Sequence, residues 1–156
     1  MANLPLSQGY LNLLASSVTI QNYPALNVTA PYLAKRSIRL APEGDVTKYI
    51  DVLTGAVPSP QPYILMTATM ALTKTLWLAA AYQSQYQASV YLGTVTIRPD
   101  VTRGSGGLQP FVLQNASLMT PGEMNFGGEE ADFMVPIKGV WQVNANLWNG
   151  LIAAFG

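Results

Sequence analysis

Apolar and polar residues alternate with a period of two along most of this chain, which predicts a protein built mainly from β-strands. The clearest case is residues 63–73, where the apolar side chains of one face alternate with tyrosine and threonine on the other. The apolar face consists of Ile64, Met66, Ala68, Met70 and Leu72. Residues 131–143 alternate in the same way and predict a long final strand, with Pro136 as the point where it could break.

Shorter alternating segments predict further strands, at residues 18–20, 26–30, 36–40, 46–53, 94–98 and 111–115. Residues 41–45 (APEGD) have the composition of a turn, so we expect a long hairpin over residues 36–53 with its tip there. Residues 57–62 contain three prolines, which cannot donate backbone hydrogen bonds, and they are interpreted as a stiff connector.

The pattern changes after Lys74, where apolar residues recur four positions apart and predict a helix over residues 74–87. After Lys74 and Thr75 this helix has no charged face, because its remaining polar positions are only Gln83, Ser84, Gln85 and Gln87. A helix that is apolar nearly all round is covered on most sides. One sheet of a small domain cannot cover both sides, so we expect a neighbouring subunit there. The candidate inter-subunit residues are Trp77, Leu78, Tyr82, Tyr86 and, near the carboxyl end, Trp148.

The low charge of the chain supports this expectation of assembly. At 156 residues the default is one domain, and only 16 residues are charged, which is 10% of the chain and gives a net charge of zero. Soluble domains typically carry about 25% charged residues. A surface with so few charges and no net repulsion is poorly protected against association. We therefore predict a subunit of an obligate assembly.

Candidate chemistry is sparse. The chain has no histidine and no cysteine, which excludes nucleophilic catalysis through a Ser-His or Cys-His pair and metal sites built from these residues. Residues 103–107 (RGSGG) lack the ending of a phosphate-binding loop, and residues 129–132 (EEAD) lack the ligand spacing of a calcium loop. A carboxylate pair formed in three dimensions stays open. We expect no enzyme and no cofactor.

Partners are also restricted by the sequence. Lys35, Arg36 and Arg39 form the only basic cluster, which is less than the basic stripe of a nucleic-acid-binding protein. The first residues lack the basic region and apolar core of a signal peptide, and no apolar run approaches the ~20 residues that span a bilayer. A soluble protein made in the cytoplasm is expected.

Several segments together resemble a known family. They are residues 24–31 (PALNVTAP), 55–63 (GAVPSPQPY), 72–75 (LTKT), 82–86 (YQSQY), 93–97 (GTVTI) and 139–144 (GVWQVN). Their order and spacing are similar to those of bacteriophage tail tube proteins over residues 10–148. The loops at 103–107 and 121–128 and the apolar end of the chain have no counterpart in this pattern.

The resemblance implies a mainly β (α+β) fold, a β-sandwich or barrel-like domain with one flanking helix, similar to the tube of type VI secretion systems. Residues 1–156 would form one domain, with an N-terminal arm (1–16), a hairpin tip and proline connector (41–62) and an apolar tail (149–156). Homohexameric rings would stack into a hollow tube that conducts DNA to the host cell. Long hairpins would pair edge to edge into its inner barrel.

The resemblance also implies partners and contacts. The protein would be a virion component synthesised in the bacterial host cytoplasm, where it would assemble with itself and with the tail sheath or other tail proteins. Its lumen would hold tape-measure protein and genomic DNA without sequence-specific binding. Inter-ring candidates are Glu43, Gly44, Asp45, Pro58 and Pro60; candidates for a lumen that repels phosphate are Asp51, Glu129, Glu130 and Asp132.

Two other functions stay open. One is a different ring-forming component of a tail or baseplate, which would close as a single ring and not extend. The other is a monomeric ligand-binding β-barrel, such as a carbohydrate-binding module that uses an exposed Trp141 or Trp148 as a platform.

Overall fold

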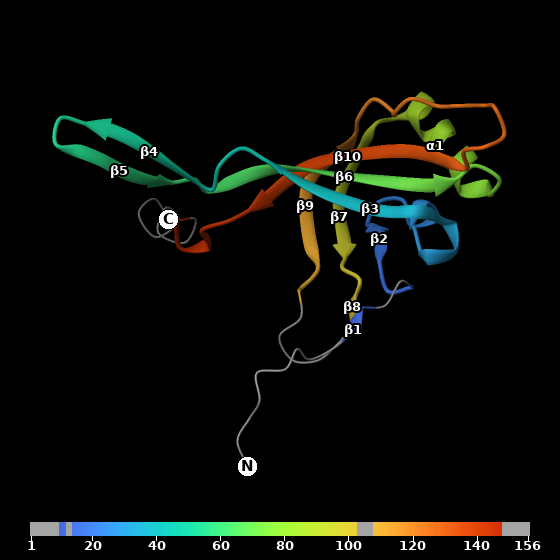
Figure 1. Ribbon diagram of the computed structural model, residues 1–156, viewed down its shortest axis with the longest axis horizontal. Coiled ribbons are helices and arrows are strands. Elements are labelled where there is room, and N and C mark those ends of the chain that lie inside the picture. Colours follow the sequence, from blue (N-terminus) through green and yellow to red (C-terminus); the bar gives the residue numbers. More distant parts are fainter. Residues whose placement is uncertain (1–9, 12–13, 103–107, 148–156) are drawn as a thin grey trace, which may run out of the picture.

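A computed structural model describes residues 10–11, 14–102 and 108–147 (Figure 1). Most of the expected N-terminal arm, the 103–107 loop, Trp148 and the apolar tail lie outside the described residues. The strands and the long helix, in chain order, are β1 (Tyr10–Leu11), β2 (Ser17–Ile20), β3 (Leu33–Glu43), β4 (Thr47–Val52), β5 (Gly55–Pro60), β6 (Tyr63–Thr73), α1 (Trp77–Ala88), β7 (Tyr91–Arg98), β8 (Val101–Thr102), β9 (Phe111–Leu118) and β10 (Asp132–Gln142).

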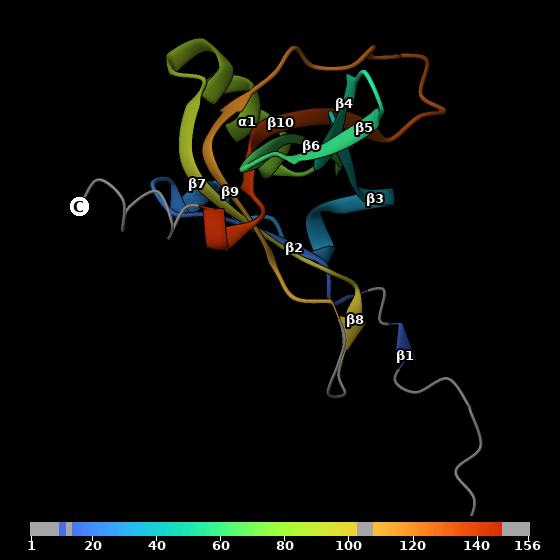
Figure 2. The same cartoon turned by 90° about the vertical axis from the view of Figure 1, so that its left-hand side faces the viewer.

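One six-stranded antiparallel sheet forms the body, with the strand order β2-β7-β9-β10-β6-β3. The sheet curls into a half-barrel, as the view in Figure 2 shows, and α1 lies against it. The structure thus confirms a mainly β, barrel-like fold with one flanking helix. Two further pairs, β1 with β8 and β4 with β5, lie outside this sheet.

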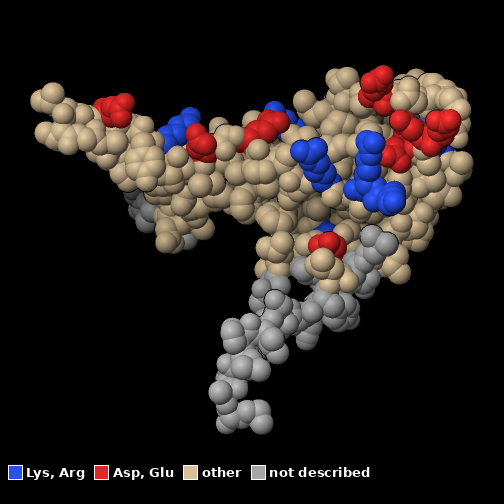
Figure 3. Space-filling view, viewed as in Figure 1, with Lys and Arg blue, Asp and Glu red and all other residues tan. Residues whose placement is uncertain are grey.

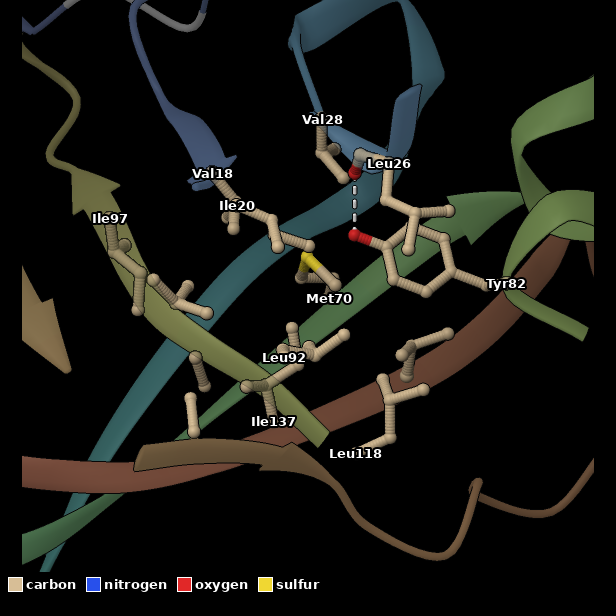
Figure 4. Close-up of a cluster of buried hydrophobic side chains, with 14 of the residues drawn as sticks. Val18, Ile20, Leu26, Val28, Met70, Tyr82, Leu92, Ile97, Leu118 and Ile137 are labelled. Carbon is tan, nitrogen blue, oxygen red and sulfur yellow. Dashed lines mark hydrogen bonds between the residues drawn. The ribbon is translucent and has the colours of Figure 1, made fainter. Parts of the chain in front are cut away.

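The inner face of the curled sheet carries the hydrophobic core (Figure 4). All five apolar residues predicted on one face of residues 63–73 are buried, which confirms the predicted alternation of β6. The same holds for Phe133, Val135 and Ile137 of β10. Because β6 and β10 are central strands paired in register along eleven residues each, they supply the continuous floor of the core.

The helix α1 is stabilised by packing and not by its ends. It begins after Leu76, which makes no side-chain cap, and it has no acidic residue in its first turn and no basic residue in its last. Isolated helices of this length are marginal in water. Burial of Leu78 and Tyr82 in the core therefore holds the helix in place. The predicted helix over 74–87 is confirmed, with a start three residues later.

Pro136 does not break the last strand. It lies opposite Thr69 of β6, and its carbonyl accepts a 2.9 Å hydrogen bond from the backbone N–H of Met119. The nitrogen and carbonyl of a strand residue point to the same side, so the missing N–H faces the β9 side. On that side the Met119 carbonyl accepts a 2.6 Å hydrogen bond from the Tyr86 hydroxyl, so it has a donor without the proline.

The prediction of a hairpin over residues 36–53 is wrong. β3 pairs with β6, not with β4, and β4 pairs with β5 across a two-residue turn at Leu53 and Thr54. The tip of the hairpin is therefore at residues 53–54 and not at 41–45. Alternation along a strand identifies its two faces but leaves its partner open, which is why the error arose.

The interpretation of residues 57–62 as a stiff connector is also wrong, because residues 55–60 form strand β5. The N–H of Gln61 donates a 2.8 Å hydrogen bond to the carbonyl of Val46, so these two residues face each other at a bonded position of the ladder. The register then places Val57 and Ser59 at bonded positions and Pro58 and Pro60 at positions that point away from β4. Prolines at such positions of an edge strand cost no hydrogen bond.

Residues 26–30, expected as a strand, instead join two short 3₁₀ helices, Pro24–Leu26 and Ala30–Tyr32. Only Val28 pairs as a strand residue, through two hydrogen bonds with Val18 of 2.9 and 2.8 Å. This segment covers the outer edge of β2 at Val18 and brings Leu26 and Val28 into the core.

Candidate functional site

The most prominent surface is a hairpin that extends beyond the body of the protein, at the left of Figure 1. We call it the projecting hairpin; it consists of residues 47–60 in β4, β5 and their turn. Only Ser59 and Thr47 in it are even partly buried, and the other residues are exposed. Its exposed large apolar side chains are those of Tyr49, Ile50, Val52, Leu53 and Val57. Val46, at its base, is also exposed.

Both faces of the projecting hairpin carry apolar side chains. Side chains alternate along each strand, so Ile50, Val52 and Val57 share one face, while Tyr49 lies on the other with Pro58 opposite it. Figure 3 shows this part of the surface as mostly uncharged, with isolated charged side chains. A two-stranded hairpin is marginally stable alone in water. A partner that covers these faces would supply the missing burial.

The base of the projecting hairpin is fixed to the end of the main sheet. The Asn144 side-chain amide donates a 2.7 Å hydrogen bond to the Gln61 carbonyl, and the Val143 N–H donates one of 3.0 Å to the carbonyl of Pro62. On the other strand, Gly44 has a φ of +92°, a conformation that favours glycine, where the chain passes from β3 to β4. These contacts set the direction in which the hairpin leaves the body.

Glu43, one of the expected inter-ring residues, belongs to a polar cluster on the outer face of the sheet. Its carboxylate lies 2.6 Å from the Lys138 ammonium and accepts a 3.1 Å hydrogen bond from the Thr67 hydroxyl. The hydrogen bond with Lys138, and then that with Thr67, hold the pKa of the Glu43 carboxyl below its ordinary value. The cluster links β3, β6 and β10 beside the hairpin base.

The other four expected inter-ring residues lie at or in the projecting hairpin. Gly44 and Asp45 are exposed at its base, and Pro58 and Pro60 lie along the outer edge of β5. The structure therefore brings this predicted set into one region. Whether it contacts another ring stays a prediction.

The exposed face of α1 is a second candidate surface. Trp77 is 56% exposed and meets Tyr32 edge to face with 5.7 Å between ring centroids. Ala80, Gln83 and Gln87 are exposed farther along, and this face carries no charge. A neutral helix face of this kind is compatible with a covered position in an assembly.

The four described helix candidates for inter-subunit contact differ in exposure. Leu78 and Tyr82 are buried, and the Tyr82 hydroxyl donates a 2.6 Å hydrogen bond to the carbonyl of Leu26 (Figure 4). Neither can touch a neighbouring molecule in this conformation, so their contacts are made within the chain. Tyr86 is partly buried and donates a 2.6 Å hydrogen bond to the Met119 carbonyl; burial raises its pKa to about 12. Trp77 is the most accessible of the four.

A groove of about 410 Å³ lies between α1 and the loop before β10. Its walls are mainly apolar and include Met124 and the largely exposed Phe126. The Lys74 ammonium donates to the Asn125 carbonyl and lies 5.5 Å from the centre of the Phe126 ring, which holds the loop near the helix. Sequence reasoning treated these residues only as a loop, because no periodic pattern joins them to the helix.

The structure does not bring the four expected lumen carboxylates together. Asp51 lies near the tip of the projecting hairpin, which extends away from the Tyr63 end of β6 (Figure 1). Glu129 and Glu130 are exposed at the opposite end, where Asp132 begins β10 and lies 3.4 Å from the Arg36 guanidinium. Eleven residues of strand separate the two ends, which is about 36 Å. All four carboxylates could therefore face one lumen only if different subunits supplied them.

The described part of the chain has no group of three or more histidine, cysteine or acidic residues that could hold a metal ion. None of its helices is both long enough and apolar enough to cross a membrane. Trp141, the described candidate for a sugar platform, is partly buried and packs on Phe111 with 5.4 Å between ring centroids.

The sequence matches no protein-family model and no curated protein.

Proposed function

We propose that this protein is the subunit of a bacteriophage tail tube, in which hexameric rings stack into a hollow conduit for DNA. The observation that carries the proposal is the projecting hairpin, an extended element with apolar side chains on both faces and few charges. Natural proteins rarely leave such an element uncovered. Repeated copies of the chain, each covering the hairpin of another, would remove it from water.

Two further features support an assembly of identical copies. The exposed face of α1 is neutral, and the chain as a whole has 10% charged residues with a net charge of zero. In the proposal, the lumen does not bind DNA tightly, because the sequence has only eight basic residues and a net charge of zero, and its one basic cluster is Lys35, Arg36 and Arg39. Function is then mechanical and needs no catalytic site.

A different ring-forming tail or baseplate component is the second candidate, and it shares the same surfaces. The two differ in whether rings stack, which electron microscopy of the purified chain distinguishes. A sugar-binding barrel is less well supported by Trp141, because a platform residue needs an exposed ring and this one packs on Phe111.

The decisive experiment shortens the projecting hairpin without disturbing the body. The Gln61 N–H donates to the Val46 carbonyl, so residues 47–60 can be replaced by Asn-Gly, a two-residue turn that closes a facing pair of this kind. We expect folded subunits that form no tubes. The matched control replaces only Leu53 and Thr54 by Asn-Gly and keeps both strands.

Electron microscopy and sedimentation velocity would measure the outcome. Tubes from the full chain and from the control, together with their loss in the shortened chain, would support the proposal. A full chain that stays monomeric at millimolar concentration would overturn it.

A further inference from the structure

The groove between α1 and the loop before β10 has an open apolar surface. Phe133 of β10 lines it and is almost completely buried, whereas Phe126 and Met124 of the loop are 84% and 40% exposed. On the helix side the lining residues include Ala79 and Ala80, whose small side chains leave room for an occupant. Exposed apolar side chains around a hollow are typical of a binding surface.

Hydrogen bonds hold the loop that forms one wall of this groove. The Gly122 N–H donates a 3.3 Å hydrogen bond to the carbonyl of Met134, and the Asn125 side-chain amide donates one of 3.0 Å to the Glu130 carboxylate. The Lys74 ammonium, at the end of β6, donates to the Asn125 carbonyl. The groove is therefore shaped before anything binds, and an occupant does not have to order the loop.

The chemistry of the groove favours an uncharged, apolar occupant. Among the described residues that line it, only Lys74 is charged, and its ammonium already contacts the Asn125 carbonyl and the Phe126 ring. A charged occupant would lose water without gaining a free partner. At about 410 Å³ the groove lies at the lower end of the range for small-ligand pockets, so it holds a few side chains and not a folded element.

The chain contains a segment of this kind. Residues 151–155 (LIAAF), which we call the LIAAF segment, are five consecutive apolar residues and lie outside the described part of the chain. The projecting hairpin is the other apolar candidate, but it is a two-stranded ribbon and carries the charges of Lys48 and Asp51. The LIAAF segment fits the neutral groove better.

The LIAAF segment cannot reach the groove of its own chain. The groove lies at the Phe133 end of β10, whereas Val143, after the other end, donates to the Pro62 carbonyl. Ten residues of extended strand separate Phe133 from Val143, which is about 33 Å. Leu151 follows Leu147 by four residues, which span at most about 14 Å. Figure 1 shows α1 and the end of β10 at opposite ends of the sheet.

We propose that the groove between α1 and the loop before β10 binds the LIAAF segment of a second copy of this chain. The inference rests on the proposed assembly of identical copies and names one contact within it. The contact joins two different surfaces, and each copy has one of each. One copy can therefore hold a neighbour and be held by another, which links copies into a ring or a fibre.

Cysteine cross-linking tests whether the two surfaces meet, because the chain has no cysteine of its own. Gln83→Cys places a thiol in the groove, and Ala154→Cys places one in the LIAAF segment of a different chain. We expect a mixed disulfide when the two variants are oxidised together, and none from either alone. Ala88→Cys is the matched control, since Ala88 is exposed on the same helix but does not line the groove; it should give no mixed product.

A synthetic peptide of residues 148–156 tests the same contact by competition. In excess it should abolish the mixed disulfide, whereas a peptide with serine in place of Leu151, Ile152 and Phe155 should leave it unchanged. A disulfide between Gln83→Cys and Leu53→Cys in place of the expected one would identify the projecting hairpin as the occupant and overturn the inference. Absence of any mixed product with Ala154→Cys would also overturn it.

A substitution in the segment separates this inference from the proposed function. Phe155→Ser should raise the concentration needed for assembly, while Asn149→Ser, outside the LIAAF segment, should not. If Phe155→Ser assembles like the parent and no mixed disulfide forms, the contact is wrong while tube formation stands. If the full chain forms no tubes, the proposed function fails, and the mixed disulfide still decides whether the groove and the LIAAF segment meet.

Discussion

The hydroxyl of Tyr82 donates a 2.6 Å hydrogen bond to the backbone carbonyl of Leu26, and both residues are buried. The bond joins α1 to the 3₁₀ turn beside β2, across 56 residues of chain. It satisfies a carbonyl that ends a short helix inside the core, and it places the only long helix of the described residues over the open side of the half-barrel.

Tyr82→Phe should lower the free energy of unfolding by about 1–3 kcal/mol, because the Leu26 carbonyl would stay buried without its donor. Tyr86→Phe is the control, since its hydroxyl bonds to the more accessible Met119 carbonyl, and it should cost less. Urea denaturation followed by tryptophan fluorescence measures both. If both variants lost the same free energy of unfolding, the buried bond of Tyr82 would contribute no more than the accessible bond of Tyr86.

Gly139→Ala should be destabilising by about 1–3 kcal/mol through overpacking. A β-carbon at this position of β10 would lie 2.7 Å from Cβ of Leu113 and 3.2 Å from Cβ of Ala116. Gly127→Ala, in the loop, would meet nothing within 4 Å and should stay within about 0.5 kcal/mol of the parent. Thermal unfolding of the two variants side by side checks the difference.

The pairing of Glu43 with Lys138 should make part of the stability depend on acid pH. The folded pKa of Glu43 is below its ordinary value of 4.5, so its contribution is present above that value and is lost as pH falls through the lower folded pKa. Glu43→Gln should melt below the parent at pH 7 and converge with it in acid. A constant difference across this range would contradict the role of the carboxylate.

Tyr86 should titrate late in alkali. Its folded pKa is raised to about 12 by burial, so the protonated phenol favours folding, and this contribution is lost as pH rises from 10 through about 12. The absorbance difference between the parent and Tyr86→Phe should titrate near pH 12 in the folded protein. In urea the same difference should titrate near pH 10.

Leu53→Lys should separate folding from assembly. Leu53 is fully exposed at the turn of the projecting hairpin, so the thermal stability of the isolated subunit should change by no more than about 0.5 kcal/mol. If the hairpin is covered in tubes, a charge at its tip should raise the concentration needed for tube formation. Thr54→Lys places the same charge on the adjacent turn residue and shows whether its position matters. Light scattering as a function of protein concentration measures tube formation by both variants.

The repeating patterns of this sequence determined its local elements. The alternation of residues 63–73 and 131–143 predicted β6 and β10 with their buried faces, and the change of period after Lys74 predicted α1. These inferences succeed because the side-chain periods of strands and helices are local properties. The low charge likewise predicted a sparsely charged surface before any contact was known.

Pairing was decided only in three dimensions. Residues 36–40 and 46–53 are adjacent strands in sequence, yet they pair with β6 and β5, because which strands share hydrogen bonds depends on the whole sheet. The same holds for Pro58 and Pro60, whose effect depends on whether their nitrogens point towards β4 or away from it. A sequence pattern records which residues share a face, whereas a hydrogen-bonded ladder also requires a partner and a register, and these come from the tertiary structure.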